Sequence, residues 1–157
     1  MKAMNPNRVR KGAVAVEFAI VAPVLLALLF GMIQYGKAFE IQNQLQVAAR
    51  EGARFASMDH AGMLTAGQTS NQKLIEEVKS FLATYGINKN DVTVGVKDHA
   101  NPTADFNLDD PANDLKLFDV KVSVNFSKVS LRPVSAGNDY GLTAKVVFRN
   151  GKATISQ

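Results

Sequence analysis

Apolar positions form an unbroken run near the N-terminus and give way to periodic patterns further along the chain. From Ala13 to Ile33 the sequence reads AVAVEFAIVAPVLLALLFGMI, in which Glu17 is the one ionisable residue. At about 1.5 Å per residue, a helix of this length measures roughly 31 Å, close to the thickness of a bilayer's hydrocarbon core. The run is apolar all round after Glu17, unlike the amphipathic helices of globular domains. The pattern therefore predicts a transmembrane helix over residues 13–34.

The same helix is predicted to continue as an amphipathic half over residues 35–57. Pro23 is the one helix-breaking residue in 13–57, and membrane helices tolerate the bend that it introduces. Beyond residue 34, apolar and small residues recur at helical spacing. They are Ile41, Leu45, Ala48, Ala49, Gly52, Phe55 and Ala56. The whole helix would be about 65–70 Å long.

Small residues gather near the end of this helix and allow another backbone to approach closely. They are Ala48, Ala49, Gly52, Ala53 and Ala56. Two interpretations remain open. The residues pack under a sheet of the same chain, which we favour, or they pack against a neighbouring subunit.

Residues 58–157 are predicted to form a small α+β domain. Met58–Ser70 is polar and reads as a linker, and Asn71–Tyr85 has the apolar stripe of a second helix, with Ser70 or Asn71 as N-cap and Gly86 as its stop. Alternating apolar residues predict strands at 91–97, 119–127, 142–149 and 153–156, the last two joined through Asn150-Gly151. A long helix, a second helix and a small, mostly antiparallel sheet define the α+β class.

Charge is concentrated at the N-terminus. The net charge of +4 equals the contribution of Lys2, Arg8, Arg10 and Lys11, so residues 13–157 are neutral overall. A short basic leader over residues 1–12 does not indicate a nucleic-acid surface. By the positive-inside rule it places the N-terminus in the cytoplasm and the C-terminal domain on the opposite side of the membrane.

The composition excludes several kinds of site. With no cysteine, the chain has no disulfide, thiolate zinc site or cysteine nucleophile, and His60 and His99 read as surface residues in loops. The loop 98–116 contains Asp105, Asp109, Asp110 and Asp114 but no calcium-loop pattern, so it reads as a solvated loop. We therefore predict no cofactor, no metal, no small-molecule substrate and no enzymatic activity, with the adjacent Asp109 and Asp110 as a weak candidate for a hydrolase.

Glu17 distinguishes three interpretations of the N-terminal segment. A cleaved secretory signal is disfavoured because no small-x-small site ends the run, and an uncleaved signal anchor of a periplasmic binding module leaves Glu17 unexplained. Cleavage after Gly12 would instead give Ala13 a new ammonium group. The ammonium group of a neighbouring copy could then pair with Glu17 and offset the cost of burying it.

At this point the sequence resembles a known family. The leader, Gly12, Glu17, the aromatic Phe18 and the apolar helix look like the class III signal of prepilins. Residues 10–57 resemble TadE-like proteins, which are minor pseudopilins of the tight-adherence (Flp, type IV) pilus system. The resemblance rests on Pro23, the region from Gly31 to Gly36 and the segment AAREGAR at 48–54. The family usually has Tyr after the Glu, where this chain has Phe18.

This resemblance implies a structural role and a set of partners. A prepilin peptidase would cut between Gly12 and Ala13, and Glu17 and Phe18 would set the register of assembly. Other pilins and pseudopilins, the secretion ATPase and the pilus assembly platform would be the partners. The protein would lie in the inner membrane with a single span, in contact with its lipid, and could be incorporated in the pilus.

Overall fold

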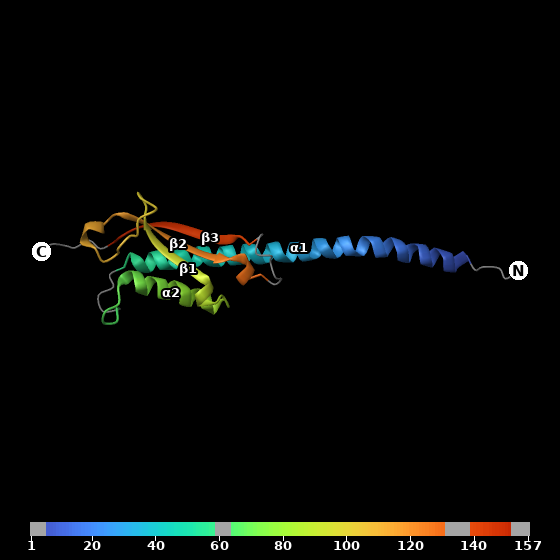
Figure 1. Ribbon diagram of the computed structural model, residues 1–157, viewed down its shortest axis with the longest axis horizontal. Coiled ribbons are helices and arrows are strands. Elements are labelled where there is room, and N and C mark those ends of the chain that lie inside the picture. Colours follow the sequence, from blue (N-terminus) through green and yellow to red (C-terminus); the bar gives the residue numbers. More distant parts are fainter. Residues whose placement is uncertain (1–5, 59–63, 131–138, 152–157) are drawn as a thin grey trace. The chain divides into compact units, whose positions relative to one another are not determined.

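The computed structural model describes residues 6–58, 64–130 and 139–151, with side chains from residue 12 onward. Its elements follow the order α1 (Pro6–Ala56), α2 (Ser70–Thr84), β1 (Val92–Asp98), β2 (Leu117–Asn125) and β3 (Gly141–Arg149) (Figure 1). Three short 3₁₀ turns, η1 (Lys89–Asp91), η2 (Pro111–Asn113) and η3 (Phe126–Lys128), flank the strands. The predicted α+β class is confirmed.

Helix α1 begins earlier than the sequence pattern predicted. It starts at Pro6, so the second half of the predicted leader is already helical, and it runs through Pro23 without interruption. Proline suits the first turn of a helix because its missing N–H would have no partner there. Residue contacts divide the chain within this helix, into one unit at Met1–Lys37 and a second at Ala38–Gln157.

Helix α2 is capped one residue before the predicted position. Thr69 Oγ1 accepts a hydrogen bond from Gln72 N at 3.2 Å, and Gln72 Oε1 accepts one from Thr69 N at 3.1 Å, which is a capping box. The prediction of Ser70 or Asn71 as N-cap was wrong, because both side chains bind the loop that precedes β2. At the other end Gly86 has φ +81° and ends the helix as predicted.

The sheet is antiparallel, with the strand order β1-β2-β3. Val122 of β2 lies opposite Val94 of β1 and Ala144 of β3. The predicted strands at 91–97, 119–127 and 142–149 agree with the structure to within two residues at each end. The predicted strand at 153–156 lies outside the described residues, so the hairpin predicted through Asn150-Gly151 stays a prediction.

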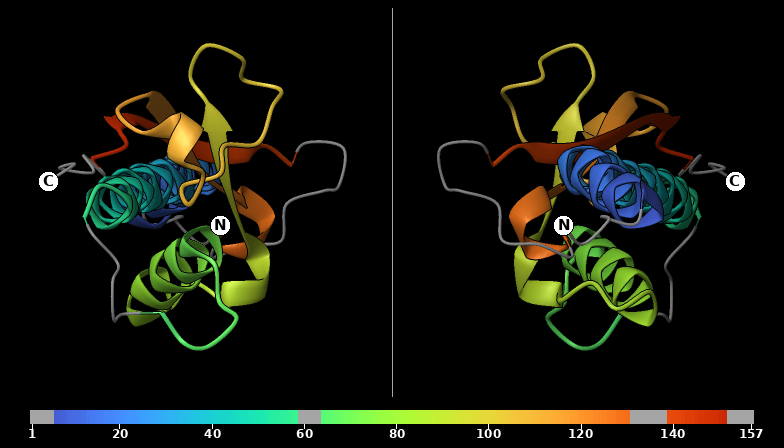
Figure 2. Two further views of the ribbon diagram at one scale, coloured as in Figure 1. Left: turned by 90° about the vertical axis from the view of Figure 1, so that its left-hand side faces the viewer. Right: turned by 90° about the vertical axis from the view of Figure 1, so that its right-hand side faces the viewer.

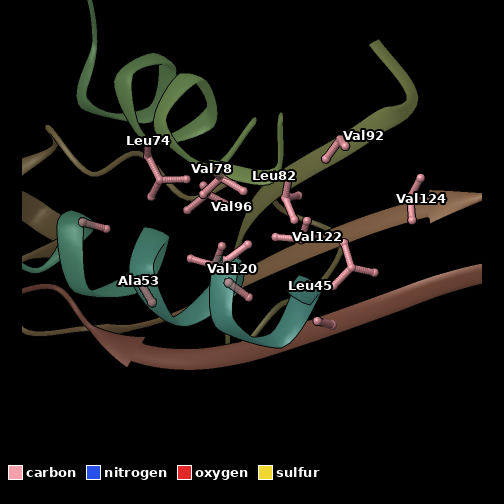
Figure 3. Packing of buried hydrophobic residues seen from close by; sticks show 14 of the residues in the cluster. Leu45, Ala53, Leu74, Val78, Leu82, Val92, Val96, Val120, Val122 and Val124 are labelled. Carbon is pink, nitrogen blue, oxygen red and sulfur yellow. The ribbon is translucent and has the colours of Figure 1, made fainter. Parts of the chain in front are cut away.

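The core of the second unit lies between one face of this sheet and two helices. Figure 2 shows the second half of α1 and the whole of α2 on the same side of the strands. Alternate residues of β2 point toward them, and Val120, Val122 and Val124 are at most 2% exposed. In Figure 3, Leu74, Val78 and Leu82 of α2 point into the same cluster. Burying these faces is what fixes the register of the strands.

The end of β3 closes the second unit against the end of α1. Asn150 is fully buried, its N–H donates to Lys116 O at 2.9 Å, and its carbonyl oxygen accepts from Leu115 N at 3.0 Å. A Cβ atom on Gly151 would lie 2.5 Å from Ser57 O, so only glycine fits at this contact. The end of α1, the residues before β2 and the residues after β3 are far apart in sequence, and they contact one another at this end of the second unit.

Candidate functional site

The predicted processing and register residues all lie in helix α1. Gly12, Ala13, Glu17 and Phe18 are exposed in the structure, and Phe18 is 67% exposed. Ala13 and Glu17 are four residues apart, so they lie on the same face of the helix, one turn from each other. The bond between Gly12 and Ala13 therefore lies inside the helix, about one turn from Glu17.

Within residues 12–37, the described side chains of its unit, the apolar run around Glu17 is exposed. Large side chains such as Ile20, Leu28 and Met32 are 69%, 62% and 71% exposed. Among the described residues, the segment from Gly12 onward forms one helix that is long and apolar enough to cross a membrane, with a mean hydropathy of 2.6 in its most apolar part. This helix could therefore span a bilayer, where the exposed side chains would contact lipid or other helices.

The small residues near the end of α1 are buried in the second unit. Ala48, Ala49, Ala53 and Ala56 are completely inaccessible to solvent. A Cβ atom on Gly52 would lie 2.5 Å from Val78 Cγ2 of α2 and 3.8 Å from Val120 Cγ1 of β2. Of the two interpretations above, the structure shows the packing under the chain's own sheet and adds a contact with α2 that the sequence did not suggest.

An open apolar cleft of about 330 Å³ runs between α1 and α2 beside Gly52. Its lining is Glu51, Gly52, Arg54, Phe55, Glu77, Val78 and Phe81. On one rim Arg54 Nε lies 2.9 Å from Glu51 Oε2, and on the other Lys73 Nζ lies 2.9 Å from Glu77 Oε1. The charges of the rim are thus paired with each other, and the pattern does not indicate catalytic chemistry.

The sequence pattern failed to identify a buried carboxylate on the opposite face of the sheet. The Asp119 side chain is 3% exposed, its Oδ2 lies 2.6 Å from Lys145 Nζ, and its Oδ1 lies 2.8 Å from His99 Nδ1. Burial raises the pKa of Asp119, but the hydrogen bonds from Lys145 and His99 outweigh burial and hold the pKa below its usual value. His99 is an exposed loop residue, as predicted, and its contact with Asp119 is one that the sequence did not suggest.

The loop before β2 is less solvated than its sequence suggested. Phe106 is 1% exposed, Leu108 is fully buried, and the first turn of α2 holds both. Asn71 Nδ2 donates to Phe106 O at 2.7 Å, and Asn71 Oδ1 accepts from Leu108 N at 3.0 Å. Ser70 N donates to Asp109 Oδ2 at 2.8 Å. The prediction of a solvated loop was therefore wrong for its middle part.

The carboxylates of this loop are not gathered into one place. Asp98 and Asp110 accept hydrogen bonds from nearby backbone N–H groups, Asp105 pairs with Lys97 and Asp109 binds Ser70. Within residues 12–58, 64–130 and 139–151, no group of three acidic or histidine side chains could hold a metal ion. His60 lies outside the described residues.

Comparison with known proteins bears on the N-terminal segment. Residues 12–54 match the model of a family described as TadE-like protein. The match begins at Gly12 and includes Glu17, the apolar run and the AAREGAR segment, and it confirms the resemblance noted from the sequence. Neither the comparison with curated proteins nor that with solved structures gives a match.

This match covers the N-terminal part of the chain, residues 12–54. Over these residues the chain is similar to a family associated with the tight-adherence pilus. Its matched segment contains the helix that could span a membrane and the small residues that pack against α2 and β2.

Proposed function

We propose that this protein is a minor pseudopilin, a structural and assembly component of a bacterial tight-adherence pilus. A prepilin peptidase removes residues 1–12 by cutting between Gly12 and Ala13. The observation that carries the proposal is the family match, which begins at Gly12 and contains one carboxylate, Glu17, in the apolar run that follows.

The role of Glu17 follows from electrostatics in a medium of low dielectric. An isolated carboxylate in a bilayer is costly, and a nearby ammonium group offsets that cost. After cleavage the ammonium group is on Ala13, four residues from Glu17, which is about 6 Å along a helix axis. A neighbouring helix shifted by about 6 Å along this axis brings its ammonium group level with Glu17, so the ion pair selects one register.

The proposed topology follows from the same segment. The N-terminus lies in the cytoplasm, the apolar run spans the inner membrane, and the second unit lies in the periplasm. There it meets other pilins and pseudopilins, while the peptidase and the assembly platform act at the membrane. The function requires no cofactor and no small-molecule substrate.

The identity of the mature N-terminus tests this proposal. Mass spectrometry of the protein extracted from membranes of cells that make the pilus is expected to find Ala13 as the first residue. Gly12→Ala is expected to abolish processing and leave the leader attached. Gly31→Ala is the matched control, because a Cβ atom at either position meets nothing within 4 Å. It should be processed normally.

Retention of Met1 in a strain with normal pili would overturn the proposal. That result would instead favour the alternative function, a signal-anchored periplasmic binding module. Normal processing of Gly12→Ala would also contradict the assigned cleavage site.

A further inference from the structure

The face of the sheet that is turned away from α1 and α2 is basic. We call it the outer sheet face and define it by Lys97, Asp119, Lys121, Lys145 and Arg149. These residues alternate with buried ones, since Val96, Val120 and Ala144 are 5%, 0% and 1% exposed on the other face. The strand register places Lys97 opposite Asp119 and Lys121 opposite Lys145.

Asp119 holds part of this face in a fixed arrangement. Its carboxylate binds Lys145 at 2.6 Å and His99 at 2.8 Å while being 3% exposed itself. The Lys145 and His99 side chains remain 48% and 42% exposed. A buried acid thus orients two cationic or polar groups that are still accessible, which reduces the entropy that a ligand must pay to order them.

Lys121 is the exposed basic residue at the centre of the outer sheet face. In the part of the chain that the structure describes, no acid lies within ion-pair distance of it. Its cross-strand neighbours are Lys145 and Gly95. A Cβ atom on Gly95 would meet nothing within 4 Å, so the position opposite Lys121 on β1 is open. Asp119 already offsets the charge of Lys145, so the charge of Lys121 is the one in this cross-strand pair that a bound anion would offset.

Neighbouring side chains limit what the anion can be. Thr93, Ser123 and Thr143 continue the face beyond Lys121, and the described part of it presents no aromatic ring. Surfaces that bind single-stranded nucleic acid combine basic residues with aromatic rings on which bases stack. Lys97 already pairs with the 87% exposed Asp105 at 2.7 Å, which shows a carboxylate from a loop reaching a lysine of this face.

We propose that the outer sheet face binds an acidic segment of a protein partner, whose carboxylates bridge Lys121 and Lys145. The exposed ammonium groups of Lys121 and Lys145, at facing positions of β2 and β3, carry this assignment. It goes beyond the proposed function and does not depend on cleavage, because every residue involved belongs to the unit Ala38–Gln157.

Binding of a model acidic peptide to the full chain in a nonionic detergent tests this proposal. The probe is a fluorescent peptide of about ten glutamates, compared with one of ten glutamines. The glutamate peptide alone is expected to bind, and raising NaCl from roughly 50 to 500 mM should weaken binding, since salt screens exposed charges. Lys121→Gln should weaken binding about 3-fold and Lys121→Glu about 10-fold or more.

Lys89→Glu is the matched control, since Lys89 is exposed in η1 and donates to Ser80 Oγ at 2.9 Å, away from this face. It should bind the glutamate peptide within about twofold of the unchanged protein. Equal effects of Lys121→Glu and Lys89→Glu would overturn the proposal. If the glutamate peptide does not bind, the proposal is also overturned. The same holds if inorganic polyphosphate binds and the glutamate peptide does not. If the protein keeps its leader but binds the glutamate peptide normally, the proposed cleavage is contradicted and the assignment of the outer sheet face stands.

Discussion

A Cβ atom on Gly52 of α1 would lie 2.5 Å from Cγ2 of Val78 in α2, closer than real Cβ contacts come. The same atom would lie 3.8 Å from Val120 Cγ1 of β2. Helix α1, helix α2 and strand β2 therefore meet at the position where α1 has no side chain. This contact sets how closely α2 and the sheet pack on the small-residue segment of α1.

Gly52→Ala is expected to destabilise the second unit by about 1–3 kcal/mol, the usual cost of overpacking a core. The clash has to exceed the gain in helix propensity, which is about 1 kcal/mol for this change. Urea unfolding of the full chain in detergent measures the difference. Gly36→Ala is the control, because a Cβ atom there meets nothing within 4 Å. A Gly52→Ala protein as stable as the unchanged one would contradict this account of the packing.

Asn71→Ala is expected to release the middle of the loop before β2. The substitution removes the acceptor of the Leu108 N–H and the donor to Phe106 O, at a cost of about 1–2 kcal/mol. Hydrogen exchange at the Leu108 amide should become at least about tenfold faster. Asn90→Ala serves as the control, since Asn90 is exposed in η1. Unchanged protection of Leu108 would mean that the apolar contacts alone hold the loop.

Acid is expected to weaken the second unit through Asp119. Because the pKa of Asp119 is lower in the folded chain than its ordinary value of 3.8, the folded state binds fewer protons than the unfolded state. The carboxylate's contribution is therefore fully present above about pH 4–5 and is lost as the pH falls through the folded pKa. The free energy of unfolding, measured between about pH 6 and pH 3, should fall less steeply for Asp119→Asn.

Asp119→Asn should also lower stability at neutral pH, by about 1–3 kcal/mol, because it weakens hydrogen bonds to a charged group in a buried position. Asp105→Asn is the matched control, since the Asp105 carboxylate is 87% exposed and its ion pair contributes little. An acid dependence of Asp119→Asn as steep as that of Asp105→Asn would remove Asp119 as a cause.

Glu17→Gln tests the register role under the proposed function. The shape of the side chain is kept and the charge is lost, so cleavage at Gly12 should continue while incorporation into pili falls about tenfold, the ratio that ~1.4 kcal/mol of lost pairing gives. Immunoblots of sheared pili and N-terminal mass spectrometry measure the two steps separately. Glu40→Gln keeps Glu17 and should assemble normally. Normal incorporation of Glu17→Gln would leave the carboxylate without the assigned role.

Helices and strands whose apolar residues recur with a regular spacing were predictable from the sequence. The alternation around Val120, Val122 and Val124 places β2 correctly, and the stripe of Leu74, Val78 and Leu82 places α2. Burial on one face imposes these periods directly, so local sequence contains the information. The similarity of residues 12–54 to the TadE-like family was recognised for a similar reason, since Gly12, Glu17 and the apolar run follow one another in the chain.

Contacts between polar residues far apart in sequence were not predictable. Asp119 occupies a position that the alternation assigns to solvent, and its burial depends on His99 from a loop and Lys145 from another strand. The roles of Ser70 and Asn71 at the loop likewise depend on where residues 106–109 come to lie. Such pairs become visible only when the strand register and loop path are known.

The contact between Ser57 and Gly151 has a consequence for how the chain folds during synthesis. The two residues are separated by more than ninety positions in the sequence, yet they lie in contact at the same end of the second unit. A nascent chain exposes the small-residue face of α1 first and receives β3 and Asn150 last. Until β3 and residues 150 and 151 have emerged, they cannot cover that face, so the nascent chain exposes apolar surface of the kind that makes incomplete folds prone to aggregate.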